Sequence, residues 1–173
     1  MRKLKLEELG RISLKAFHEL PKRPIVLVLD NIRSGLNVGS AFRTADAFAL
    51  EEVVLCGITA KPPHREILKS AIGATDSVSW SYHEEVQDAL VDLKQRGYLC
   101  IGVEQTSESI PLQEYDCPDQ PLALFFGNEV AGISDSIITS LHECIEVPQF
   151  GTKHSLNVSV CLGIVVWHVL ALR

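Results

Sequence analysis

The sequence predicts an α/β protein whose sheet is mainly parallel and is flanked by helices. Segments 25–29 and 122–126 are uninterrupted runs of apolar residues, the pattern of strands that are buried on both faces. Stretches with helical spacing lie between these runs and other strand-like segments, so strands alternate with helices along the chain. The length of 173 residues suits one domain with a full-sized core.

The first 23 residues form a basic segment, which we expect to be a helical arm. Apolar residues recur near helical spacing over residues 4–20, and the prolines at 21 and 24 end this pattern. The segment holds seven Lys or Arg against three Glu, although the whole chain carries a net charge of −6. It suits local contact with phosphates, and a solvated helix without a partner would show the same pattern. We therefore divide the chain into an arm, residues 1–23, and a domain, residues 24–173.

The other elements of the domain are recognised by their periodicity and by the residues that end them. Shorter or more exposed strands are expected at 53–57, 78–82, 98–103 and 144–148. Helices are expected at 38–50, 62–71 and 84–96, and a short helix should begin near Ser134 or Asp135. The segments 31–37, 73–75 and 104–121 are predicted to be loops, the last because it holds several prolines and polar residues.

The last segment, residues 155–170, predicts a helix that is apolar on almost every side and is therefore buried, in the core or against another chain. Its first turn carries Ser155 and Asn157, and the unpaired N–H groups at such a helix start suit a ligand. A core helix with Ser155 as its N-cap explains the same residues. Because Asn157, Ser159 and Gly163 interrupt the apolar run, we expect burial in protein and no membrane partner.

Several classes of site lack their sequence patterns. The motifs GxGxxG, GxxxxGK[ST] and GxSxG are absent, which argues against a Rossmann nucleotide site, a P-loop and an α/β-hydrolase. No HExxH pair occurs and the histidines are spread out, so we expect no metal. The five scattered cysteines without a CxxC pair indicate reduced thiols and a cytoplasmic protein. Met1 leads into a charged stretch, which does not have the pattern of a signal peptide.

Three strand-to-loop junctions, 31–43, 127–134 and 147–157, concentrate polar residues and glycines. In open α/β sheets, ligands bind beyond the carboxyl ends of the strands, and all three junctions lie there if the predicted strands are correct. The polar side chains are Asn37, Arg43, Asn128, Glu129, Ser155 and Asn157. The glycines are Gly35, Gly39, Gly127, Gly132 and Gly151. Such a set suits a polar ligand that is held partly by backbone groups.

Each polar residue also has an ordinary structural explanation. Asn37 is a natural N-cap, Arg43 can be a solvated side chain or pair with Asp46, and Glu129 can be an exposed loop carboxylate. A separation of six residues does not place Asn37 and Arg43 on one helix face. They converge only if Asn37 precedes the helix proper.

Taken together and in order, the three junctions resemble the three motifs of the SpoU (TrmH-like) family of RNA ribose methyltransferases, within the SPOUT superfamily. The first motif is similar to residues 37–45, and the second is similar to residues 126–134. The third is similar to residues 147–148 followed by 155–160. The similarity covers about residues 24–172, and the order and spacing of the motifs agree with the family.

The resemblance implies a fold and an activity that composition alone does not reveal. Family members have a parallel α/β sheet whose C-terminal part forms a deep trefoil knot, a rare exception to unknotted topology. They bind S-adenosylmethionine in the knot and are homodimers. The implied reaction is transfer of a methyl group to a ribose 2′-hydroxyl, which is a poor nucleophile and must lose its proton as it attacks.

The resemblance also implies roles for individual residues. Arg43 is linked to activation of the hydroxyl, and because an arginine stays protonated we expect phosphate clamping and proton steering from it, with the general base left unassigned. The remaining polar motif positions, which should build the catalytic pocket, are Asn37, Glu129, Ser155 and Asn157. The positions expected to contact the cofactor are Gly127, Val147, Ser155 and Leu156.

The chain departs from the family pattern at two places, and the second affects the expected substrate. Val130 stands where many members have glycine, so the loop after Glu129 is expected to have a different shape. Only the basic arm, residues 1–23, stands in place of the separate RNA-binding domain of some ribosomal RNA enzymes, which slightly favours transfer RNA, or else a compact site on ribosomal RNA. Two alternatives remain. One is a catalytically silent module of the same fold that binds RNA or cofactor, and the other is a SPOUT enzyme that methylates a base nitrogen.

Overall fold

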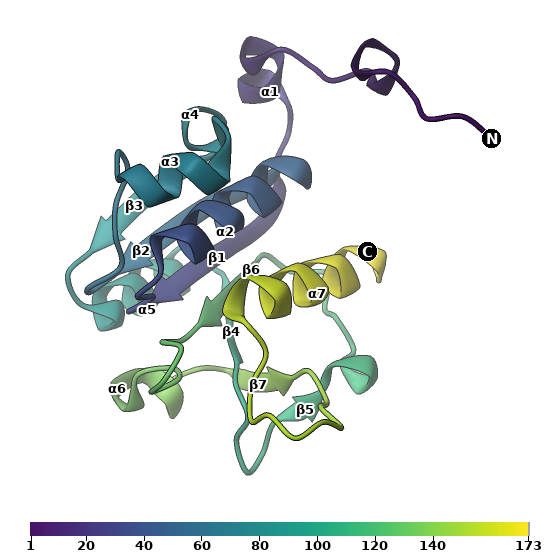
Figure 1. Ribbon diagram of the computed structural model, residues 1–173. Helices are drawn as coiled ribbons and strands as arrows, with labels where there is room; N and C mark the ends of the chain where they lie inside the picture. Colours follow the sequence, from purple (N-terminus) through teal and green to yellow (C-terminus); the bar gives the residue numbers. More distant parts are fainter. Residues whose placement is uncertain (173) are drawn as a thin grey trace.

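Seven parallel strands form a single sheet at the centre of the computed structural model, which describes residues 1–172 (Figure 1). The order across the sheet is β3-β2-β1-β6-β4-β7-β5. The strands are β1 (Arg23–Asp30), β2 (Leu50–Cys56), β3 (Ser79–His83), β4 (Leu99–Val103), β5 (Ile110–Pro111), β6 (Leu122–Phe126) and β7 (Glu143–Glu146). The predicted α/β class with a parallel sheet flanked by helices is therefore confirmed. Arg173, the last residue of the predicted domain, lies outside the described residues.

Helices cover both faces of this sheet, which explains why the central runs 25–29 and 122–126 are apolar at every position. The α-helices are α1 (Leu14–Glu19), α2 (Gly35–Ala47), α3 (Arg65–Ala71), α4 (Ala74–Ser77), α5 (Val86–Gln95), α6 (Asp135–Ile138) and α7 (Val158–Ala171). Two short 3₁₀ helices, η1 (Leu6–Leu9) and η2 (Leu112–Glu114), complete the set. In β1, Leu27 packs in the cluster that includes α2, α3 and α7, whereas Val26 and Val28 pack in the cluster that includes α5 and α6.

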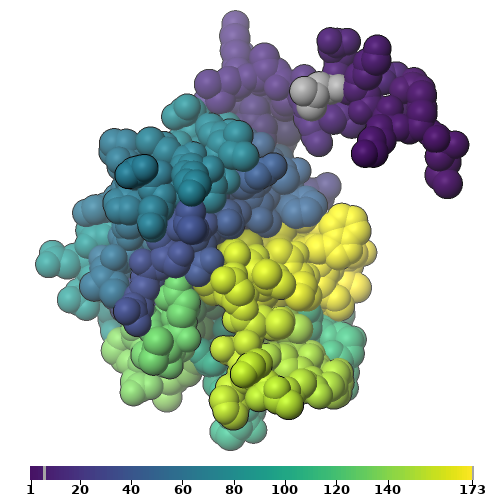
Figure 2. Space-filling view, in the orientation of Figure 1, coloured from purple at the N-terminus to yellow at the C-terminus, as the bar shows by residue number. Residues whose placement is uncertain are grey.

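The N-terminal arm does not form the continuous helix that was predicted over residues 4–20. Gly10 has a left-handed backbone with φ +61° and ends η1, and α1 begins only after Ser13, whose hydroxyl accepts a hydrogen bond from the backbone N–H of Ala16 at 3.2 Å. Within α1, Phe17 is the buried residue, while Leu9 and Ile12 are exposed. The arm stands off the body of the molecule, shown in purple in Figure 2. Without a surface to cover its apolar face, helical spacing alone does not maintain a long helix.

Two helix starts differ from the prediction because other side chains provide the caps. The helix predicted to begin at residue 38 begins at Gly35, since the hydroxyl of Ser34 accepts a hydrogen bond from the backbone N–H of Asn37. Asn37 is therefore inside the first turn of α2 and is not its N-cap. At the start of α7 the cap is Asn157, so the alternative in which Ser155 is the cap is wrong.

Two predicted loops contain short regular elements. Segment 73–75 was expected to be irregular, but α4 is a single turn of helix that begins at Ala74 and packs against α2. Within the predicted loop 104–121, β5 pairs with β7 at the edge of the sheet and η2 follows directly. Both elements are stabilised by tertiary packing, which local sequence does not reveal.

The strand order determines which loops meet. Because β1, β6, β4 and β7 are neighbours and run in the same direction, the segments that follow them emerge at one edge of the sheet. These segments are the start of α2, the 127–134 loop, Glu104 and its neighbours, and the 147–157 loop. The fold therefore brings the three predicted junctions together.

Candidate functional site

A pocket of about 510 Å³ lies at the carboxyl edge of the sheet. Its walls come from the ends of β4, β6 and β7, from the loops that follow them and from the start of α7. The predicted site residues among its lining are Gly127, Glu129, Val147, Ser155, Leu156 and Asn157. A cavity of this volume is within the range of small-molecule sites.

A chain of side-chain hydrogen bonds links three distant segments, and two of its members, Glu129 and Asn157, line the pocket, whereas Asn37 does not. The amide nitrogen Nδ2 of Asn37 donates to Oε1 of Glu129 at 3.0 Å. Nδ2 of Asn157 in turn donates to Oδ1 of Asn37 at 3.2 Å. We call these three residues the amide–carboxylate chain. It contains one residue from each of the three sequence junctions, so the structure brings these predicted residues together.

The carboxylate of Glu129 is surrounded by donors. Its Oε2 accepts from the backbone N–H of Arg33 at 3.0 Å, and its Oε1 accepts from the N–H of Ser34 at 3.3 Å as well as from Asn37. Desolvation acts to raise the pKa of Glu129, but the hydrogen bonds from Arg33, Asn37 and Ser34 outweigh it and lower the pKa below its ordinary value. Glu129 is thus an ionised acceptor that fixes the start of α2 and is poorly suited to take up a proton.

The loop that presents Glu129 is closed on itself. Asn128 and Gly132 exchange two backbone hydrogen bonds of 2.9 Å, and Oδ1 of Asn128 accepts from the N–H groups of Val130 and Ala131. A side chain at Gly127 would overlap the backbone of Gly132, which explains the glycine at position 127. The loop thus requires this glycine for its own folding, independently of any ligand.

Two residues that the sequence did not single out take part in the site. Oε2 of Glu104 accepts from the backbone N–H of Ile133 at 3.0 Å, and Nε2 of Gln105 donates to the carbonyl of His154 at 3.2 Å. Both line the pocket. Their signal was their position, because they directly follow the strand that ends at Val103 and so lie at the same sheet edge.

Arg43 lies outside the pocket of its own chain. It is six residues beyond Asn37 on α2, which places it about 9 Å along the helix axis and roughly two thirds of a turn around it. Its side chain is exposed and has neither a hydrogen bond nor an ion pair among residues 1–172. The expected alternative partner, Asp46, instead accepts a hydrogen bond from the hydroxyl of Ser77. The condition for convergence of Asn37 and Arg43 is not met, because both residues lie within the same helix.

The glycines of the first junction serve helix packing. A Cβ at Gly39 would overlap the hydroxyl of Ser70 and the carbonyl of Ile67 on α3, and a Cβ at Gly35 would crowd Glu66. These glycines therefore allow α2 and α3 to pack closely. Gly151, which was grouped with them, is exposed and has open space around it.

Other classes of site find no support in residues 1–172. Within this range, no group of three or more His, Cys, Asp or Glu side chains is placed to hold a metal ion. Among the same residues, no helix has the length and apolar character needed to cross a membrane.

Residues 24–167 match the SpoU rRNA Methylase family. The chain belongs to this family. The match includes all three junctions and the amide–carboxylate chain. The resemblance seen in the three motifs is thereby confirmed.

Individual relatives of this SpoU-family chain act on different RNAs. A 23S rRNA (guanosine-2′-O-)-methyltransferase of Neisseria meningitidis is 31% identical over 147 residues, which are 85% of this chain and 58% of that protein. The crystal structure of the TrmH/SpoU tRNA modifying enzyme of Aquifex aeolicus has a TM-score of 0.81 at 25% identity, covering 92% of this chain and 82% of that one.

An AdoMet-bound rRNA methyltransferase from Sinorhizobium meliloti has the same fold, with a TM-score of 0.79 at 22% identity over 90% of this chain and 59% of that one. This chain therefore spans somewhat more than half of the Neisseria and Sinorhizobium proteins.

Proposed function

We propose that this chain is the catalytic domain of an S-adenosylmethionine-dependent methyltransferase that modifies a ribose 2′-hydroxyl of RNA. The observation that carries the proposal is the amide–carboxylate chain, in which Glu129 and Asn157 line the pocket and Asn37 joins them by hydrogen bonds. The name of the Neisseria relative supports the 2′-oxygen as the acceptor, and family membership supports methyl transfer.

The residues of the pocket fit S-adenosylmethionine. Apolar side chains, including Val147 and Leu156, offer a surface for the adenine ring, and the carboxylates of Glu104, Glu129 and Glu146 suit the positive charges of the ligand. We assign Gly127, Val147, Ser155 and Leu156 to cofactor binding. When bound, S-adenosylmethionine supplies a methyl group activated by a positively charged sulfur. The protein therefore mainly positions the acceptor hydroxyl and favours the loss of its proton.

The residues of the amide–carboxylate chain hold the reacting parts in place. Glu129 fixes the first turn of α2 through the N–H groups of Arg33 and Ser34, and Asn157 joins that turn to α7. Transfer would form the bond between the 2′-oxygen and the methyl carbon as the carbon–sulfur bond breaks, with S-adenosylhomocysteine as the product and the hydroxyl proton passing to a base that we leave unassigned. Arg43 stays protonated, so its role is to clamp an RNA phosphate and steer the departing proton.

We further propose that the protein is a homodimer and that its C-terminal part forms the family's trefoil knot. Val160, Ile164 and Trp167 form an exposed apolar stripe along α7, which a second copy would cover. Because Arg43 lies outside its own pocket, Arg43 of one copy serves the pocket of the other.

The free cysteines are consistent with a cytoplasmic protein. We keep residues 1–23 as an arm and treat the rest as the catalytic domain.

Transfer of radiolabelled methyl groups from S-adenosylmethionine to unmodified transfer and ribosomal RNA tests this proposal. We expect label in one RNA class from the unaltered protein. Arg43→Ala should abolish transfer while calorimetry still detects cofactor binding. Full activity of Arg43→Ala would contradict its assigned role. Absence of label together with intact cofactor binding would indicate a silent binding module.

Mixed dimers test whether Arg43 acts across the interface. Arg43→Ala and Ser155→Ala chains, co-expressed with different tags, should form mixed dimers in which one of the two sites is intact. Mixed dimers purified through both tags should have roughly half of the unaltered activity. Inactive mixed dimers would show that Arg43 serves its own chain.

A further inference from the structure

Two strongly exposed apolar side chains lie on the loops that build the pocket. Val130, on the 127–134 loop, is 79% exposed and lines the pocket. Phe150, on the 147–157 loop, is 98% exposed and directly follows Gln149, which also lines the pocket. A single exposed apolar residue needs no explanation. Two of them, on two loops of one pocket, indicate a surface that is covered by a binding partner.

The loop that carries Phe150 is attached to the pocket on both sides of this residue. Val147 and Gln149 line the pocket before it, and the carbonyl of His154 accepts a hydrogen bond from Gln105 after it. The segment around residue 150, coloured yellow-green in Figure 2, lies at the outer surface of the molecule. Phe150 is therefore presented to solvent at the rim of the pocket and does not belong to the core.

The charges of the site are divided between its interior and its rim. The pocket wall carries the carboxylates of Glu104 and Glu146 beside Glu129, so it repels phosphate groups. Lys153, next to His154 on the 147–157 loop, is exposed, and so is Arg33, whose backbone N–H binds Glu129. A ligand with both a flat apolar part and a phosphate matches this combination better than a purely apolar partner does.

We propose that Phe150, together with Val130, stacks against an unpaired base of the RNA, while Lys153 holds a neighbouring phosphate. An unpaired nucleotide exposes the face of its base, whereas bases within a duplex are already stacked on one another. Stacking on an aromatic ring tolerates any base, so these residues select for unpaired structure near the target ribose and not for a sequence. This inference rests on the proposed function, because it describes how the same site holds its substrate.

Binding of a fluorescein-labelled single-stranded RNA of about 12 nucleotides tests the inference, with fluorescence anisotropy as the readout. Phe150→Ala should weaken binding about tenfold, and Phe150→Tyr, which keeps an aromatic ring, should restore it to within about twofold. Lys153→Ala should lower the slope of log Kd against log salt concentration by about 0.7. Val91→Ala is the matched control, since Val91 is a half-exposed apolar residue on α5, on the other face of the sheet.

Several results would overturn the inference. Equal binding by Phe150→Ala and the unaltered protein would be one such result, and equally tight binding of the same RNA annealed to its complement would be another. Loss of the dimer in Phe150→Ala, measured by light scattering, would show that this residue contacts a second copy instead. If the unaltered protein transfers no methyl group but its RNA binding still depends on Phe150, only the proposed function fails.

Discussion

Asn157 performs two separate tasks with one side chain. Its Oδ1 accepts from the backbone N–H groups of Ser159 and Val160 and so caps α7, while its Nδ2 donates to Asn37. The two tasks are separable because aspartate retains the acceptor and lacks the donor. We expect Asn157→Ala to lower the free energy of unfolding by about 1 kcal/mol, measured in urea, and Asn157→Asp to lower it less.

Both variants should lose methyl transfer, because both break the bond to Asn37. The contrast between stability and activity is the informative result. A fully active Asn157→Asp variant would mean that the amide–carboxylate chain is not needed for the reaction.

Glu129 should make the stability of the protein depend on acid pH. Its pKa is lower in the folded protein than in the unfolded chain, so its ionised form stabilises the fold above the unfolded pKa. This stabilisation is lost as the pH falls through the lower, folded pKa. In Glu129→Gln, urea unfolding between about pH 3 and 6 should show a shallower loss of stability toward acid than the unaltered protein. Identical pH profiles would show that the hydrogen bonds to Glu129 contribute nothing to stability.

The sequence selected several residues that the structure brings together, but it did not predict their arrangement. Asn37, Glu129 and Asn157 were all selected, and the structure joins them by hydrogen bonds. Glu104 was missed because it begins a segment that was predicted only as a loop, although its place directly after β4 puts it at the same edge of the sheet. The position of Arg43 outside the pocket depends on where α2 begins, and that start is determined by the cap at Ser34.

At the scale of the elements, the contact between α2 and α3 depends on Gly39. A methyl group there would overlap Ser70 and the backbone of Ile67, so we expect Gly39→Ala to lower the free energy of unfolding by about 1–3 kcal/mol. Gly163 on α7 is the matched control, because a Cβ there meets nothing within 4 Å. Gly163→Ala should raise stability by up to about 1 kcal/mol, as alanine favours helix. Equal effects of the two changes would refute this explanation of Gly39.

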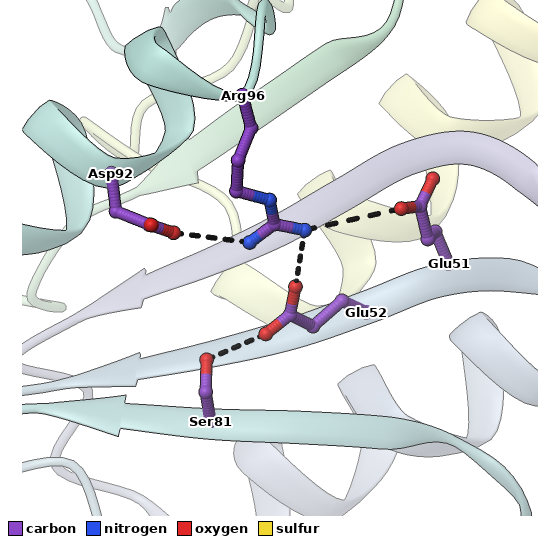
Figure 3. Close-up of polar contacts among 5 residues, drawn as sticks. All are labelled: Glu51, Glu52, Ser81, Asp92 and Arg96. Carbon is purple, nitrogen blue, oxygen red and sulfur yellow. Dashed lines mark hydrogen bonds and ion pairs between the residues drawn. The ribbon is translucent and has the colours of Figure 1, made fainter.

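A cluster of charges around Arg96 connects the end of α5 to the start of β2 (Figure 3). Arg96 pairs with Glu52 at 2.8 Å and with Asp92 at 3.1 Å, and Glu52 also accepts from the hydroxyl of Ser81 at 2.6 Å. These residues lie where the parallel strands begin, which is the edge opposite the pocket.

Arg96→Met should therefore cost no more than about 1 kcal/mol of stability, as partly exposed ion pairs are screened by water and salt. Methyl transfer at low temperature should be unchanged. A loss of activity without unfolding would show that this cluster communicates with the site.

The central elements were predictable and the ends of the helices were not. Residues 25–29 of β1 and residues 122–126 of β6 are covered on both faces, so apolar residues occupy every position of these runs and the pattern is unambiguous. Helix ends depend on single side-chain caps such as Ser34 and Asn157. The arm is not one continuous helix because apolar residues such as Leu9 and Ile12 have no surface to cover, which is a property of the whole structure and not of the segment.

At the scale of the whole molecule, the strand order determines how the site is assembled. The three members of the amide–carboxylate chain come from segments far apart in sequence, and they meet because β1, β6 and β7 end at one edge of the sheet. The order of strands in a parallel sheet cannot be read from local periodicity. The proposed knot is likewise a property of the complete chain. The proposed dimer depends on a second copy, and the exposed apolar stripe on α7 supports it.

Analysis of the modified nucleoside tests the central claim most directly. Unmodified transfer and ribosomal RNA would be incubated with the protein and S-adenosylmethionine, digested to nucleosides and examined by mass spectrometry. The proposed function predicts a methyl group on the ribose, identified by a fragment that contains the methylated sugar and an unmodified base. A methyl group on the base would contradict the assignment of the 2′-oxygen as acceptor.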